Sequence, residues 1–315
     1  MEQEMTPEPL NGRIKFHLTN LPPEVVQEIA TVLPVASAAC LALTSHSMAA
    51  ILGTQYWKFH SRNDKNDFLA CLEQDLPQYR HCLTCAMFHP AAGRRTHKGC
   101  ISLREKSTSE EECKKADGNV DLSDGYVIQY RDVQLALNRH RYGSQHGIGL
   151  DAFAYREMEG PLIYYHERLF IRAKIVNNEL LLRIQLTTPT HIWSTHRWSN
   201  NPNAYCPHTY ENRHNPQSVK GFLPGVLSEA LHINNPFSYP DSEVHRCQSC
   251  LTEYQVEHIS QIVICVTVWK NLGSGRNPND PKWRSHVRSA SNNSNTTKGI
   301  YFKAGSIRDA WDGQK

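Results

Sequence analysis

Two cysteine pairs with the same internal spacing are the clearest candidates for chemistry in this chain. Cys82 and Cys85 form one C-x2-C motif, and Cys247 and Cys250 form the other. Two intervening residues allow a tight turn to bring both sulfur atoms onto one tetrahedral Zn²⁺ ion. The sequence therefore predicts that at least one pair belongs to a structural zinc site.

Each pair is accompanied by further residues of the kind that ligate zinc. His89 and Cys113 follow the first pair, whereas Cys206 and His208 precede the second. Because four ligands close a structural zinc site, two sites are predicted: Cys82, Cys85, His89 and Cys113, and Cys206, His208, Cys247 and Cys250. A single site made from the two C-x2-C pairs is an alternative that the sequence leaves open.

The remaining histidines and cysteines form no recognisable catalytic pattern. The groupings that can be drawn are a dyad of Cys206 with His191 and His196, and a metal triad of His140, His146 and Asp151. Nothing in their spacing fixes such geometry, and the chain lacks a G-x-S-x-G elbow, a P-loop and an H-E-x-x-H motif. We expect no enzymatic activity, and we interpret Cys40, Cys71 and Cys265 as small core residues.

The elements that must position the cysteines are mostly strands. A strand is predicted to begin at Tyr126, with a short helix over 133–139 as an alternative for its second part. Strands over 169–175 and 179–186 flank Asn177-Asn178, a good hairpin turn because Asn tolerates positive φ. The β-branched run at 261–269 predicts a buried strand.

The segments between these strands are predicted to be loops. Residues 90–118 are polar and read as a long loop that needs to be held in place. Residues 187–224 are predicted to be loops, with a short helix within 219–231. Residues 273–299 are rich in Gly, Asn, Ser and Pro and predict a flexible loop, and 300–302 predicts a last strand.

The N-terminal part of the chain has the periodicity of short helices. Helix starts are predicted at Asn20, Ser37 and Ser45, whose side chains can accept a backbone N–H bond. Pro34 should end the first helix and Gly53 the third. A further helix capped by Asn63 is expected to link this module to the strands.

The same module resembles an F-box. The residues that carry the resemblance are Leu21-Pro22-Pro23-Glu24, Ile29, Leu33 and Leu41-Ala42-Leu43-Thr44. The resemblance implies binding to a Skp-family adaptor, and through it to a cullin ubiquitin ligase. The adaptor-binding residues that it implies are Leu21, Pro22, Pro23, Glu24, Ile29, Leu33, Leu41 and Leu43. A helical piece of this size cannot bury a self-sufficient core, so its apolar face needs a partner.

A wider similarity extends over most of residues 18–260. Asp75-Leu76-Pro77, the Cys113-x2-Ala-Asp-Gly segment, Cys206-Pro207-His208 and the segment from Arg246 to Tyr254 are similar to a group of fungal F-box proteins. This extension implies kinship and carries over neither a ligand nor a zinc assignment.

Composition narrows the class of protein further. The 315 residues contain no run of eighteen apolar residues, and the N-terminus lacks the apolar region of a signal peptide. We therefore expect a cytoplasmic or nuclear protein that has no membrane contact and carries thiols rather than disulfides. Residues 270–315 carry nine Lys/Arg and three Asp/Glu, a balance of +6. Basic residues among aromatic ones can bind nucleic acid, but we favour a solvated loop and edge strand.

The sequence thus predicts an α+β protein with an N-terminal three-helix F-box and a β-rich domain held together by zinc. The expected division is a flexible tail (1–14), the F-box (15–60), a linker helix (61–80) and the β-rich domain (81–312). The expected function is non-catalytic presentation of an unknown substrate protein to a ubiquitin ligase. The alternative is a stand-alone zinc-containing binding protein, for example for nucleic acid, which need not recruit cullin.

Overall fold

The computed structural model describes residues 18–91, 108–123, 126–159, 167–189, 206, 208, 243–260, 262–287 and 300–313. It divides into two compact units, Met1–Leu72 and Glu73–Lys315. The first is helical and the second is built on antiparallel sheets, so the predicted α+β class is confirmed. The predictions for the tail (1–14), the helix within 219–231, His191 and His196 lie outside the described residues.

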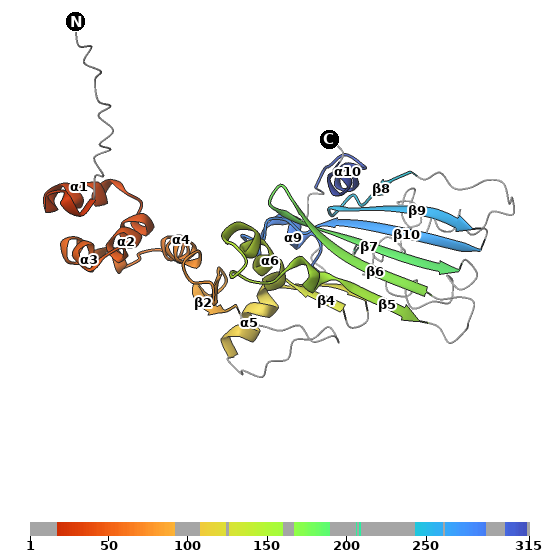
Figure 1. The fold of residues 1–315 in the computed structure, drawn as a ribbon, viewed down its shortest axis with the longest axis horizontal. Helices are drawn as coiled ribbons and strands as arrows, with labels where there is room; N and C mark the ends of the chain where they lie inside the picture. Colours follow the sequence, from red (N-terminus) through yellow and green to blue (C-terminus); the bar gives the residue numbers. More distant parts are fainter. Residues whose placement is uncertain are drawn as a thin grey trace, which may run out of the picture. The chain divides into compact units, whose positions relative to one another are not determined.

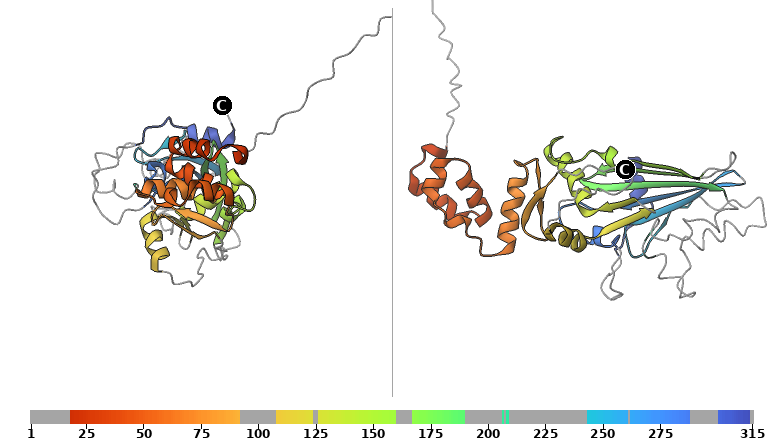
Figure 2. Two further views of the ribbon diagram at one scale, coloured as in Figure 1. Left: turned by 90° about the vertical axis from the view of Figure 1, so that its left-hand side faces the viewer. Right: turned by 90° about the horizontal axis from the view of Figure 1, so that it is seen from below.

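Three short helices and a longer one make up the first unit (Figures 1 and 2). They are α1 (Pro23–Val32), α2 (Val35–Leu43), α3 (His46–Leu52) and α4 (Arg62–Glu73), with 3-10 turns at Leu18–Asn20 and Gln55–Trp57. α4 continues by one residue into the second unit. The core of α1–α3 is small and half alanine: Val26, Ala30, Ala38, Ala42, Met48 and Leu52.

Proline, rather than a capping side chain, begins the first two helices. Pro22 and Pro34 occupy the N-cap positions of α1 and α2, so the predicted caps Asn20 and Ser37 are wrong. Pro34 ends one helix and directly starts the next, which leaves no linker for Ser37 to cap. The prediction for α3 is confirmed, because the Ser45 side chain accepts a bond from the Met48 amide and Gly53 ends the helix at φ 67°.

The start of α4 also differs from the prediction. Asn63 lies inside the helix rather than at its cap. Ser61 takes that place, since its Oγ accepts a hydrogen bond from the Asp64 amide at 3.0 Å. The Ser61 hydroxyl also donates to the Asp64 carboxylate at 2.7 Å, so the pair resembles a capping box.

A six-stranded antiparallel sheet with the order β5-β6-β7-β10-β9-β8 dominates the second unit (Figure 1). Its strands are β5 (Tyr155–Glu159), β6 (Glu167–Val176), β7 (Glu179–Pro189), β8 (His245–Arg246), β9 (Thr252–Ser260) and β10 (Val263–Asn271). Two small hairpins accompany it: β1 (Tyr79–Cys82) with β2 (Met87–Pro90), and β3 (Asn119–Ser123) with β4 (Tyr126–Gln129). The helices are α5 (Thr108–Asp117), α6 (Tyr130–Tyr142), α9 (Pro281–Arg284) and α10 (Ser306–Asp312), with a 3-10 turn at Leu150–Phe153.

The strand predictions near the sheet centre are confirmed. β6 and β7 pair as a hairpin whose turn, Asn177-Asn178, has φ values of 51° and 60°. β10 is buried along most of its length between β7 and β9. The helical alternative after Tyr126 is also correct, because β4 ends at Gln129 and α6 follows at once.

Opposite faces of the sheet have different coverings (Figure 1). One face builds the main core with α6, since alternate β7 residues such as Leu182 and Ile184 belong to the same core cluster as Val133 and Leu137 of α6. On the other face α10 packs its Ile307 and Trp311 against Leu181 and Trp269. The start of α10 is fixed by Glu253, a buried β9 carboxylate that accepts bonds from the amides of Ile307 (3.2 Å) and Arg308 (2.9 Å).

Three loop and strand predictions are wrong. The predicted loop 90–118 contains α5, which its polar sequence hides because few apolar residues mark a helical face. The predicted flexible loop 273–299 is packed over 273–287, where Trp283 is fully buried and Asp280 caps α9. Residues 300–302 form no strand, and α10 follows them.

The described helices are also too short for a membrane. The longest, α6, has 13 residues, whereas a helix that spans a bilayer needs about 20 apolar ones. No helix in the described ranges meets the length and apolarity that such a span requires.

His286 should make the stability of the second unit depend on pH. It is buried after α9, with Nε2 2.9 Å from the Asn271 carbonyl, and burial followed by the charge of Lys270 lowers its pKa from 6.5 to about 3. Only the unfolded chain then binds this proton, so stability falls as the pH drops below 6.5. When the pH falls from 7 to 5.5, the free energy of unfolding of His286→Gln, measured with urea, should decrease by about 1 kcal/mol less than that of wild type. The control is His60→Gln, at an exposed position. The prediction is contradicted if His286→Gln loses as much free energy of unfolding over this pH range as wild type or the control does.

Candidate metal centres

The β1–β2 hairpin presents three donors of the first cluster. Cys82 ends β1, Cys85 lies in the turn and His89 lies on β2. The turn is tight, because the Ala86 amide donates to the Cys82 carbonyl at 2.8 Å and Ala86 adopts a φ of 53°. The Cys85 Sγ and the His89 Nε2 are consequently 3.1 Å apart.

The fourth donor, Cys113, comes from α5, which is anchored at its C-terminal end. The Trp283 Nε1–H donates to the Asp117 carbonyl at 2.7 Å, and the Arg284 guanidinium donates to the Ala116 carbonyl at 2.7 Å. The Thr84 hydroxyl, in the turn of the hairpin, donates to the Asp117 carboxylate. These bonds hold α5 against the hairpin and place the buried Cys113 thiol beside the other donors.

The second cluster is built around the turn that joins β8 to β9. The Cys247 amide donates to the Thr252 carbonyl at 2.9 Å, and the Thr252 amide donates to the Cys250 carbonyl at 2.8 Å. The Ser249 amide points at the Cys247 sulfur from 3.3 Å. This turn aims both sulfur atoms at one point.

Cys206 and His208 complete that cluster from a distant part of the chain. The Cys206 Sγ lies 3.4 Å from the Cys247 Sγ, 3.2 Å from the Cys250 Sγ and 3.2 Å from the His208 Nδ1. All three cysteines belong to the main hydrophobic core. The second cluster is therefore buried inside the unit rather than attached to its surface.

Both clusters fit the donor set of a closed tetrahedral metal site. In each, one ligand atom from every residue lies within 4.8 Å of the others. A Zn–S bond of about 2.3 Å implies sulfur atoms about 3.8 Å apart at tetrahedral geometry, close to the spacings seen here. The eight predicted ligands thus fall into the two predicted groups, and the two C-x2-C pairs do not share one site. Metal binding itself stays a prediction.

The electrostatics of each cluster favour a thiolate. Burial raises the pKa of the Cys82 thiol, but hydrogen bonds from His89 and Cys85 outweigh burial and bring the pKa to about 6. Hydrogen bonds from Cys206 and Cys250 strongly lower the pKa of Cys247, whereas burial raises that of Cys250 to about 12. A divalent cation would stabilise all three thiolates of a cluster at once.

Lys270 is a buried charged residue that interacts electrostatically with the second cluster and that the sequence analysis missed. It lies on β10, paired with Thr252, and its side chain is completely buried. Burial lowers its pKa, while the charges of Cys206, Cys250 and Cys247 raise it. Three thiolates and one divalent cation would leave a net charge of −1, which the ammonium group would balance. A lysine inside the apolar run 263–271 was the available signal.

The predicted metal triad is not assembled. Among the residues that the structure describes, metal-ligating atoms converge only in the two clusters, so His140, His146 and Asp151 form no triad. Cys206 belongs to the second cluster, whereas His191 and His196, its partners in the predicted dyad, lie outside the described residues. Cys265 is buried as predicted, Cys40 is half-buried, and the prediction for Cys71 is wrong because it is exposed on α4.

Comparison with known proteins adds no further assignment. No family model, curated protein or solved structure matches this chain. The interpretation of both clusters therefore depends on their geometry and chemistry.

Metal content should follow the two clusters independently. Elemental analysis of the purified protein should find about two zinc ions per chain, one for each closed four-ligand set. Cys82→Ser with Cys85→Ser should remove one ion, Cys247→Ser with Cys250→Ser should remove the other, and Cys265→Ser should remove neither. A metal-free wild type that is folded and unaffected by chelators would refute the assignment.

Replacing Lys270 should have opposite effects with and without metal. Lys270→Met should weaken zinc binding at the second cluster about tenfold, as removal of groups around a metal site does. In metal-free protein the same change should not lower the free energy of unfolding, because it removes a buried charge. Chelator competition and urea unfolding measure the two effects, with the exposed Lys303→Met as control. Unchanged zinc affinity would show that Lys270 does not balance the site.

Proposed function

We propose that this chain is an F-box protein whose helical unit binds a Skp-family adaptor and thereby joins a cullin ubiquitin ligase. The observation that carries the proposal is the apolar surface left open by so small a helical unit. Exposed large hydrophobic residues in this unit are Leu18, Val25, Val32, Val35, Leu43 and Trp57. Such residues mark an interaction site where they form one contiguous patch.

The proposed adaptor-binding residues divide into two groups. Pro22, Pro23, Glu24 and Leu43 are exposed, and Leu43 retains 49% of its accessible surface. Ile29 is half-buried, as are Leu21, Leu33 and Leu41, which pack against the core of the unit. Substitutions in this last group would disturb the unit as well as the interface, so the exposed group provides the cleaner test.

The second unit would present the substrate without catalysis. We infer that its two clusters hold structural zinc, since each has four protein ligands and leaves no open coordination position for a reacting water. Each cluster joins segments that are far apart in sequence. Zinc there would stabilise the sheet and its surrounding loops as a rigid recognition surface for a substrate protein.

A stand-alone zinc-containing protein that binds nucleic acid is the competing function. Basic residues near the C-terminus favour it, but of the aromatic residues that could stack on bases, Trp283 and Trp311 are buried, Phe302 is half-buried and Tyr301 alone is largely exposed. Stacking on nucleotides needs exposed rings. One largely exposed ring offers little stacking surface, which favours a protein ligand, and co-purification of cullin would distinguish the two functions.

The exposed leucine of α2 provides the test of adaptor binding. Leu43→Asp should reduce capture of a Skp-family adaptor at least tenfold, because it places a charge in a dry apolar contact. Ile259→Asp, at an apolar residue of β9 that is 62% exposed, is the matched control and should bind normally. Circular dichroism should show both variants folded. Equal capture by the two variants would exclude this surface as the adaptor site.

A further inference from the structure

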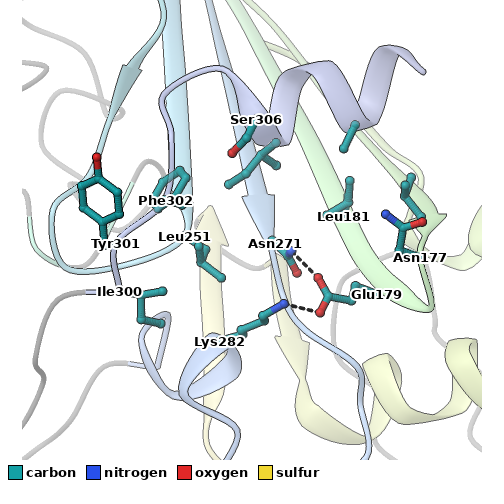
Figure 3. Close-up of a pocket in the computed structure, with 13 residues that line it drawn as sticks. Asn177, Glu179, Leu181, Leu251, Asn271, Lys282, Ile300, Tyr301, Phe302 and Ser306 are labelled. Atoms are coloured by element: carbon teal, nitrogen blue, oxygen red, sulfur yellow. Dashed lines mark hydrogen bonds and ion pairs between the residues drawn. The ribbon is translucent and has the colours of Figure 1, made fainter. Parts of the chain in front are cut away.

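A pocket with a volume of about 320 Å³ opens at one end of the large sheet (Figure 3). Leu181 from β7, Leu251 just before β9 and Ile307 from α10 line it with apolar surface. Ile300 and Phe302, from the segment before α10, form a further wall. No ligand of either cysteine cluster lines the pocket, and the proposed function does not use it.

The charged groups of the pocket satisfy one another. The Glu179 carboxylate accepts from the Lys282 ammonium and, at 2.6 Å, from the Asn271 Nδ2 (Figure 3). The Asn271 Oδ1 in turn accepts from the Gly273 amide at 2.8 Å. No net charge is left for a ligand to neutralise, and the rest of the lining is largely apolar. The chemistry therefore fits an uncharged apolar group.

The segment 300–302 has the character of an unpaired strand. Ile300 and Phe302 pack toward α10 and the sheet, whereas Tyr301 between them is 86% exposed, which is the alternation of a strand. Within the described residues no backbone hydrogen bond involves these three residues. The guanidinium group of Arg246 lies 5.1 Å from the Tyr301 ring centre and 5.6 Å from that of Phe302. Free backbone donors and acceptors beside a pocket can pair with an added peptide strand.

We propose that this pocket binds a short extended peptide segment of a partner protein. One neutral apolar side chain of the peptide enters the pocket, and its backbone pairs with residues 300–302. A cavity of about 150 Å³ holds a benzene molecule, so this pocket accommodates a leucine or phenylalanine side chain with adjoining backbone. The exposed Tyr301 ring flanks the entry as an amphipathic contact. The inference stands whether or not the first unit binds an adaptor.

Methyl NMR of the full chain tests the proposal with defined probes. The peptides are acetyl-Gly-Ser-X-Ser-Gly-amide, with X as Leu, Phe, Asp or Lys. The Leu and Phe peptides should shift the methyl signals of Leu181, Ile300 and Ile307 saturably, and the Asp and Lys peptides should bind at least tenfold more weakly. Absence of any saturable shift with the Leu and Phe peptides would overturn the proposal.

Two further comparisons separate the pocket from non-specific contact. Ser306→Phe fills the pocket from an exposed helix position and should weaken binding at least tenfold, whereas Ile259→Ser should leave it unchanged. N-methylation of the peptide on both sides of X should also weaken binding tenfold by removing backbone donors. Equal binding by the N-methylated peptide or by folded Ser306→Phe would refute the proposal. So would binding that appears only after residues 288–299 are replaced by a Gly-Ser linker, because the chain itself would then be the occupant.

Discussion

The burial of sulfur ligands inside the main core is the constraint on which the second unit depends. Cys206, Cys247 and Cys250 belong to the same packed cluster as the sheet leucines, and a fully buried lysine lies on the neighbouring strand. Buried charges are tolerated only when they balance one another. A cation among three thiolates, with Lys270 on the adjacent strand, would provide that balance. Structural zinc contributes about 10 kcal/mol or more to folding, which is comparable with the whole net stability of a domain, about 5–15 kcal/mol.

The segment 281–286 connects the two clusters and the pocket. Trp283 and Arg284 hold the C-terminal end of α5 and thus position Cys113 for the first cluster. His286 contacts the carbonyl of Asn271 at the end of β10, one residue after Lys270. Lys282 and Asn271 also form the polar floor of the pocket. The two candidate metal sites, the sheet and the proposed peptide pocket therefore share a few residues, so a substitution at one of them should also affect the others.

The sequence predicted what depends on local spacing. The C-x2-C motifs, the Asn177-Asn178 turn, the Ser45 cap and the buried run of β10 each carry a pattern within a few residues. Prediction from the sequence failed where contacts between distant segments determine the local structure. α5 has a polar sequence and is held by the Trp283 side chain, which is distant in the chain. Segment 300–302 has strand-like alternation but no strand partner among the described residues. The role proposed for Lys270 depends on cysteines of other segments, which its local sequence does not reveal.

Amide hydrogen exchange with and without zinc tests the central claim most directly. If the two clusters hold the second unit together, chelation should abolish protection in α5, in the β1–β2 hairpin and in β9. Protection in α1–α3 should be unchanged, because no ligand of either cluster lies in the first unit. Full protection of α5 and β9 in verified metal-free protein would contradict the account, since the fold would then stand without the metal.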